Sequence, residues 1–286
     1  MSGTLHSQTG RQLGNQLGSR VDGAVEGLAP GYFALVMATG ILSVGTLLVG
    51  ATALSRTLLA LGVVAFAVLL LLTGRRVLAH RTAVVADLHD PGRAFGFFTF
   101  VAATDVLGIR LGMAGHHGTT GVLLAVACLT WLVLGYVVPW TAVLGPQPRP
   151  VLARANGSWF IWVVASQSVA AAAAGVEPVV GQGRRELALL AVVSWSVGVF
   201  LYAAVGLCVV LRMVVHELPP EELTPPYWVS MGALAITVVA GARIVEMADA
   251  PMVDATRGLI AACRWSSGRS PPGWCPSWSP PGGGAT

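Results

Sequence analysis

The sequence has no lysine and few charges of either sign. All 17 basic residues in the 286-residue chain are arginine, and only 10% of the residues are charged. Without a lysine amine, Schiff-base chemistry with retinal or pyridoxal phosphate is excluded. Soluble domains carry about 25% charged residues, whereas this chain is 55% hydrophobic with a mean hydropathy of +0.72. The composition therefore favours a single membrane-embedded bundle over a soluble enzyme.

Ligands for metals and nucleic acids are also scarce. The four cysteines form no CxxC pair, and Cys128 and Cys208 lie inside apolar stretches, where a free cysteine behaves as a small hydrophobe. We expect no disulfide framework, no metal site and no cofactor; the pair His116-His117 has no other ligands nearby in the sequence. The arginines lie in short loops between apolar runs, which indicates membrane topology rather than nucleic-acid binding.

Seven apolar segments are long enough, at about 20 residues, to cross a bilayer as helices. They comprise residues 30–50, 57–74, 94–113, 120–144, 157–176, 187–211 and 227–247. The sequence thus predicts an all-α integral membrane protein with about seven transmembrane helices. It divides into a disordered cytoplasmic tail (1–29), a helical bundle (30–247), and a last part (248–286) with the start of a helix and a low-complexity Pro/Gly/Ser/Trp tail.

The arginines predict the orientation in the membrane. Nine lie in the N-terminal tail and in the loops after segments two, four and six, against four after segments one, three and five. Arginine accumulates in cytoplasmic loops. We therefore expect a cytoplasmic N-terminus and a location in the bacterial inner membrane.

The odd-numbered segments differ from the even-numbered ones. Each odd segment opens with an aromatic pair and then carries small, hydroxyl or amide residues at depth. The pairs are Tyr32-Phe33, Phe97-Phe98, Trp159-Phe160 and Tyr227-Trp228. Because polar groups facing lipid are costly, the odd segments are predicted to form an inner ring and the even ones an outer ring. The alternative is that the small and hydroxyl residues serve only helix packing.

Asp105 and Gln167 are the most informative polar residues at depth. Asp105 is a carboxylate in an apolar segment. It is either a pore-facing or proton-coupling group, or it forms a structural hydrogen bond or ion pair or is held protonated. Arg110 lies about 140° further round the same helix and is expected near the extracellular interface. Gln167 either offers neutral donors for weak anion selection or bonds a neighbouring helix. Arg243 and Glu246 are expected to pair with each other.

Four stretches together resemble the tellurite-resistance/C4-dicarboxylate transporter family, the TehA-like group that also contains plant slow-type anion channels, and they fit its actinobacterial branch best. These are PGYFALVMATGILSVG (30–45), FGFFTFVAATDVLGIRL (95–111), WFIWVVASQSVA (159–170) and PPYWVSMGALAITVVAGA (225–242). The resemblance implies ten helices in five hairpins, odd helices around a central pore, a homotrimer, and an aromatic gate from the ninth helix. No complete membrane segment follows residue 247, so helices eight to ten and the gate have no counterpart here.

These observations predict a channel or exporter for small inorganic or carboxylate anions in a lipid bilayer. The candidate pore-lining residues are Phe33, Thr39, Phe98, Thr104, Asp105, Phe160, Gln167, Ser230 and Thr237. A seven-helix receptor or sensor without transport is one alternative, and a non-functional truncated family member is another. An intramembrane enzyme is disfavoured because one buried Asp, without a His at depth, supplies no acid–base or metal set.

The final residues interrupt an apolar run that begins at Gly258. Residues 263–286 are rich in Pro, Gly, Ser and Trp, a mixture that neither spans a membrane nor packs a core. Shifted by one base, codons for Trp265 to Gly284 can encode an apolar helix similar to the family's eighth. The sequence-based hypothesis is therefore a frameshifted or truncated member, with an inner ring left open.

Overall fold

The computed structural model describes residues 20, 22–145, 151–216 and 225–247. The segment predicted as a Pro/Gly/Ser/Trp tail, and with it the frameshift hypothesis, lies outside these residues. The last part of the predicted N-terminal tail is ordered: residues 22–26 are helical and Val25 is buried. This helical stretch is held to the bundle because Asp22 and the backbone oxygen of Glu26 accept hydrogen bonds from arginines of the first hairpin.

The seven predicted membrane segments are all present as helices. Each is long and apolar enough to cross a bilayer, and no strand occurs in the ranges that the structure describes. The prediction of an all-α membrane protein is thereby confirmed. The helices are α2 (Ala34–Leu48), α3 (Thr52–Ala79), α5 (Phe98–Gly112), α6 (His117–Val138), α7 (Phe160–Val176), α8 (Arg184–Val215) and α9 (Val229–Val245).

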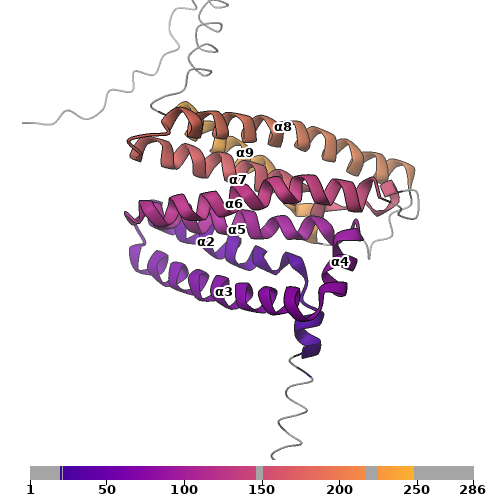
Figure 1. Ribbon diagram of the computed structural model, residues 1–286. Helices are drawn as coiled ribbons and strands as arrows, with labels where there is room; N and C mark the ends of the chain where they lie inside the picture. Colours follow the sequence, from indigo (N-terminus) through magenta and orange to yellow (C-terminus); the bar gives the residue numbers. More distant parts are fainter. Residues whose placement is uncertain (1–19, 21, 146–150, 217–224, 248–286) are drawn as a thin grey trace, which may run out of the picture. The chain divides into compact units, whose positions relative to one another are not determined.

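Two helices are longer than the sequence predicted. The segments read as 57–74 and 187–211 extend to 28 residues in α3 and 32 residues in α8. At 1.5 Å per residue, α3 is about 42 Å long, which exceeds the ~30 Å hydrocarbon core. In both segments the apolar run ends at arginine residues, whereas the helix continues through them. A short helix absent from the prediction, α4 (Arg81–His89), then turns across the end of the bundle (Figure 1).

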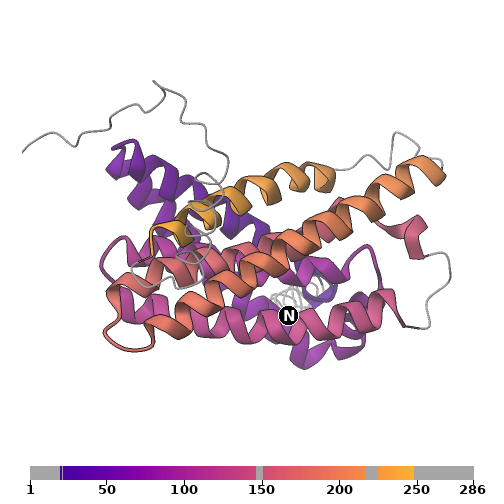
Figure 2. The same cartoon turned by 90° about the horizontal axis from the view of Figure 1, so that it is seen from above.

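Four helices form a row, and each of the first three packs against one further helix. Each of α2, α5 and α7 packs against the helix that follows it as a hairpin, with α3, α6 and α8 respectively. In addition α5 packs between α2 and α7, and α7 between α5 and α9 (Figure 1). We call α2, α5, α7 and α9 the inner row, and α3, α6 and α8 the outer helices. Figure 2 shows α9 running beside α8, its neighbour in the outer set.

Burial separates the middle of the inner row from its ends. The membrane windows of α5 and α7 are 78% and 83% buried, whereas those of α2 and α9 are 22% and 17% buried, as low as the outer helices. The expected odd–even contrast therefore holds for α5 and α7 only. The reason is positional, because α2 and α9 each have an inner neighbour on one side.

All four inner helices begin with a 3-10 turn, and these turns meet at one end of the bundle. Successive turns in the row touch one another, so we call the set the collar. Its members are η1 (Pro30–Phe33), η2 (Ala94–Phe97), η5 (Gly157–Trp159) and η8 (Pro225–Trp228). The aromatic pairs seen in the sequence lie at these turns.

Glycine allows the backbones of the collar to approach closely. A Cβ built on Gly96 would lie 3.1 Å from the backbone nitrogen of Gly31, and one on Gly157 would overlap the backbone of Pro226 and Tyr227. Beside this contact the Trp159 indole donates to the Pro91 carbonyl at 2.9 Å. The collar therefore tolerates no side chain at residue 157.

We predict that Gly157→Ala destabilises the protein, because the added methyl overlaps backbone atoms that cannot move aside. Overpacking of this kind costs about 1–3 kcal/mol, to be measured as the free energy of unfolding in mixed micelles. The matched control is Gly121→Ala in α6, where a Cβ meets nothing within 4 Å and alanine favours the helix. Equal stability of the two variants would contradict the close approach.

Candidate functional site: the polar centre of the inner row

Three consecutive residues of α7 each bond a different neighbouring helix. Ser166 accepts a hydrogen bond from the Trp131 indole of α6 at 2.9 Å. Gln167 donates through Nε2 to the Trp195 carbonyl of α8 at 3.2 Å. Ser168 donates to a carboxyl oxygen of Asp105 on α5 at 2.8 Å. Successive helical residues point about 100° apart, so a run of three polar residues reaches three neighbours.

The amide of Gln167 is fitted into the surface of α8. A Cβ on Gly198 would overlap the Gln167 amide, so the glycine provides the space that it occupies. From the same turn of α8, the Trp195 indole donates to the Thr237 carbonyl of α9 at 3.0 Å. The polar contacts thus run from α7 through α8 to α9. The sequence left two roles open for Gln167, a bond to a neighbouring helix or a donor in a pore. The bond to a neighbouring helix is present.

Asp105 is buried at the junction of α5 and α7, with 1% of its surface exposed. Its Oδ2 accepts the bond from Ser168, while Oδ1, like Oε1 of Gln167, has no hydrogen-bond partner among the described residues. Asp105 thus makes a structural hydrogen bond, which was one of the roles that the sequence allowed for it.

Arg110 is buried, with 3% of its surface exposed. It donates to the hydroxyls of Ser43 on α2 and Ser55 on α3 at 3.0 and 2.9 Å. The two serines in turn each donate to the other's backbone carbonyl. The guanidinium is enclosed in the junction of α2, α3 and α5, two residues before the end of α5. It ties the first hairpin to α5 at the end opposite the collar. That this end lies near the extracellular interface stays a prediction.

The three phenylalanines among the candidate pore residues pack against other helices. Phe33 of η1 makes edge contacts with the rings of Phe66 on α3 and Phe100 on α5. Phe98 stacks on Trp162 of α7 with ring centroids 5.7 Å apart. Phe160 at the start of α7 lies against Tyr202 of α8 with centroids 5.3 Å apart. Each ring therefore contributes to an interface between helices.

The hydroxyl candidates bond their own helices. Each donates to the carbonyl three or four residues earlier, as serine and threonine commonly do in helices. The donors are Thr39, Thr104, Ser230 and Thr237, and the acceptors are the carbonyls of Leu35, Phe100, Tyr227 and Ala233. The structure brings Asp105 and the Gln167 segment to one junction and distributes the other candidates along the row. That these residues line a path stays a prediction.

Sequence reasoning missed a buried ion-pair cluster beside the collar. The carboxylate of Asp87 on α4 bonds Arg76 of α3 at 2.7 Å and Arg93 at 3.0 Å, and both Asp87 and Arg76 are almost fully buried. Arg76 also donates to the Glu26 carbonyl. In the sequence these residues lie between two apolar segments and read as loop charges that set topology. The spacing of Arg76 and Asp87 does not reveal their contact, because it forms only once α4 folds back. The expected pair of Arg243 and Glu246 is present at 3.5 Å.

Comparison with known proteins identifies the family. The family model described as voltage-dependent anion channel matches residues 27–268 of the chain. The chain belongs to this family. It is a family of channels and transporters, as the sequence stretches around the collar and the inner row indicated.

Relatives of the chain include a membrane protein and two transporters, all described as uncharacterized. The membrane protein, from Mycobacterium tuberculosis, is 66% identical over 62 residues, which cover 22% of this chain and 32% of that protein. Two transporters of Methanocaldococcus jannaschii are 26% and 24% identical over 76% and 75% of this chain, and the matches cover 64% of each transporter. The chain thus spans less than two thirds of the curated relatives that it matches. No solved structure matches it.

In the described part of the chain, no group of three or more His, Cys, Asp or Glu side chains gathers where a metal ion could be held. The polar centre instead consists of neutral donors and acceptors with one carboxyl and one guanidinium. Such a set can orient helices and present weak dipoles along a path.

Proposed function

We propose that the protein conducts or exports small anions across the bacterial inner membrane along its inner row. The observation that carries this proposal is the collar, where four inner helices begin at one end of the bundle. The first turn of a helix presents free N–H groups and the positive end of the helix dipole. Four such ends side by side favour an anion at the mouth of a path without a basic side chain in it.

The interior of the row is suited to weak interaction with an anion. The α7 stretch 170–175 is small and apolar, and the polar residues preceding it are two hydroxyls and an amide engaged with other helices. Neutral dipoles let an anion enter and leave without trapping it. Asp105, placed against Ser168, is proposed to act by holding α5 to α7, since a free carboxylate would repel the substrate.

We also propose which residues line the path, which anions are transported and how the chain assembles. The nine candidate residues from Phe33 to Thr237 are proposed to line or frame the path. Thr39, Ser230 and Thr237 are the most accessible of them, because α2 and α9 are partly exposed. Tellurite and C4-dicarboxylates are proposed substrates beside chloride and nitrate. A homotrimer is the proposed assembly.

We predict that proteoliposomes containing the chain admit chloride or nitrate faster than empty vesicles, with no uptake of potassium. Thr237→Trp should reduce this flux severalfold by narrowing the path beside α9. Val68→Trp, on the exposed face of α3, should leave it unchanged. Tellurite and malate then test the substrate range. Absence of anion flux from the folded wild-type protein would refute the proposal, and equal effects of the two Trp variants would refute the path.

We also predict that the collar end faces the cytoplasm, since Arg75, Arg76, Arg93 and Arg154 are at that end. In a Cys-free background, Thr82→Cys in α4 should react with a membrane-impermeant maleimide only after cells are permeabilised. His117→Cys, exposed at the start of α6, should react in intact cells. The reverse pattern would overturn the orientation.

A further inference from the structure

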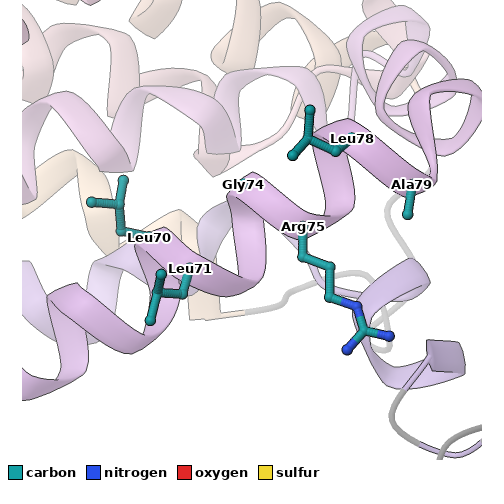
Figure 3. A pocket seen from close by; sticks show the side chains of 6 residues that line it. All are labelled: Leu70, Leu71, Gly74, Arg75, Leu78 and Ala79. Carbon is teal, nitrogen blue, oxygen red and sulfur yellow. The ribbon is translucent and has the colours of Figure 1, made fainter.

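The collar end of α3 carries two hollows separated by a ridge, formed by Leu70, Gly74 and Leu78. On one side is a groove of about 520 Å³ that also contacts Phe100 of α5 and Leu134 of α6. On the other is a shallow hollow of about 540 Å³, which includes Leu71 and Arg75. Figure 3 shows Leu78 extending from one side of α3 and Arg75 from the opposite side.

Both hollows are apolar and open to the surface of the bundle. Leu71 and Leu78 are each 74% exposed, as expected for side chains that contact lipid. Gly74 leaves a notch in the ridge, because a Cβ built there meets nothing within 4 Å. The groove lies between two outer helices, α3 and α6, and aromatic rings of the inner row form its floor. Hollows of this shape accommodate acyl chains.

An arginine lines each hollow, Arg75 the shallow one and Arg76 the groove. Arg75 is half-exposed and pairs with the half-exposed Asp22 at 2.8 Å; a surface pair of this kind contributes little and is easily exchanged. Arg81, at the start of α4, is exposed and bonds no described residue through its side chain. The buried carboxylate of Asp87 already serves Arg76 and Arg93. Arg81 follows Ala79 of the shallow hollow by two residues. Arg75 and Arg81 are therefore available to a phosphate, which guanidinium binds through paired N–H donors.

We propose that this end of α3 binds an anionic diacyl phospholipid. Its acyl chains lie in the two hollows astride the ridge, and its phosphate is held by Arg75 and Arg81. A neutral lipid could fill the hollows but would gain less from the arginines. The site is on the outer surface of α3 and is independent of the proposed passage of anions along the inner row.

The test is native mass spectrometry of the full chain, released from nanodiscs that contain equal amounts of phosphatidylglycerol and phosphatidylcholine. The wild type should retain phosphatidylglycerol preferentially. Arg75→Gln/Arg81→Gln should lower that preference about thirtyfold, since each arginine near an anionic lipid surface contributes a factor of about five. The matched control is Arg56→Gln/Arg185→Gln, which removes two exposed arginines at the opposite end and should retain the preference.

A second variant tests the hollows separately from the charges. Gly74→Leu fills the notch and should lower retention of both lipids severalfold, while Gly121→Leu, at an equally open glycine of α6, should not. Circular dichroism verifies that each variant is folded. Equal retention of the two lipids by the wild type, or an equal loss in the Arg56/Arg185 control, would overturn the proposal. A disulfide-linked dimer of Leu71→Cys would assign this face to a second copy of the chain and would also overturn it.

Discussion

The fold depends on satisfying buried polar groups where the bilayer offers no hydrogen bonds. In hydrocarbon an unpaired polar group costs several kcal/mol, so polar residues at depth are stabilised by partners within the protein. Helix α7 meets this constraint with three consecutive residues, Ser166, Gln167 and Ser168, which bond α6, α8 and α5. The hydrogen bond from Trp195 to Thr237 then adds α9. One short polar run thereby fixes the helix that occupies the middle of the inner row.

The collar places a second constraint at the end where the inner helices begin. There the backbones of neighbouring 3-10 turns meet with glycine between them, and the Asp87 ion pairs hold α3 and α4 beside the collar. Close packing of the turns also brings four helix N-termini together at this end. In the function that we propose, a path starting there selects anions by dipoles rather than by fixed charges.

The number and position of the membrane helices were predictable from sequence, because about 20 apolar residues bounded by arginine or proline have one stable form in a bilayer. The neighbours of each polar residue were not. Gln167 and Asp105 were recognised as informative, but the sequence could not distinguish a path-facing group from one bonded to an adjacent helix. The partners of Arg110, Ser43 and Ser55, were not predictable because they are more than 50 residues away. Helix α4 was not predicted because its charged residues are typical of a loop. The ion pairs of Asp87 form only when the chain folds.

The odd–even pattern was a partial guide for a related reason. Hydroxyl and small residues mark a helix that packs closely, but burial also depends on having neighbours on both sides. Helices α5 and α7 have them, while α2 and α9 are at the ends of the row and stay exposed. Composition therefore identified the inner helices, and their order in space determined how deeply each is buried.

The most direct test of this account is the stability of a variant without the α7 hydrogen bonds, Ser166→Ala/Gln167→Leu/Ser168→Ala. Its control, Thr57→Val/Ser196→Ala, removes exposed hydroxyls that bond only their own helices. The account predicts that the free energy of unfolding in mixed micelles falls by about 2–5 kcal/mol in the triple variant and by less than about 0.5 kcal/mol in the control. Equal stability of the triple variant and the control would contradict the central place given to α7.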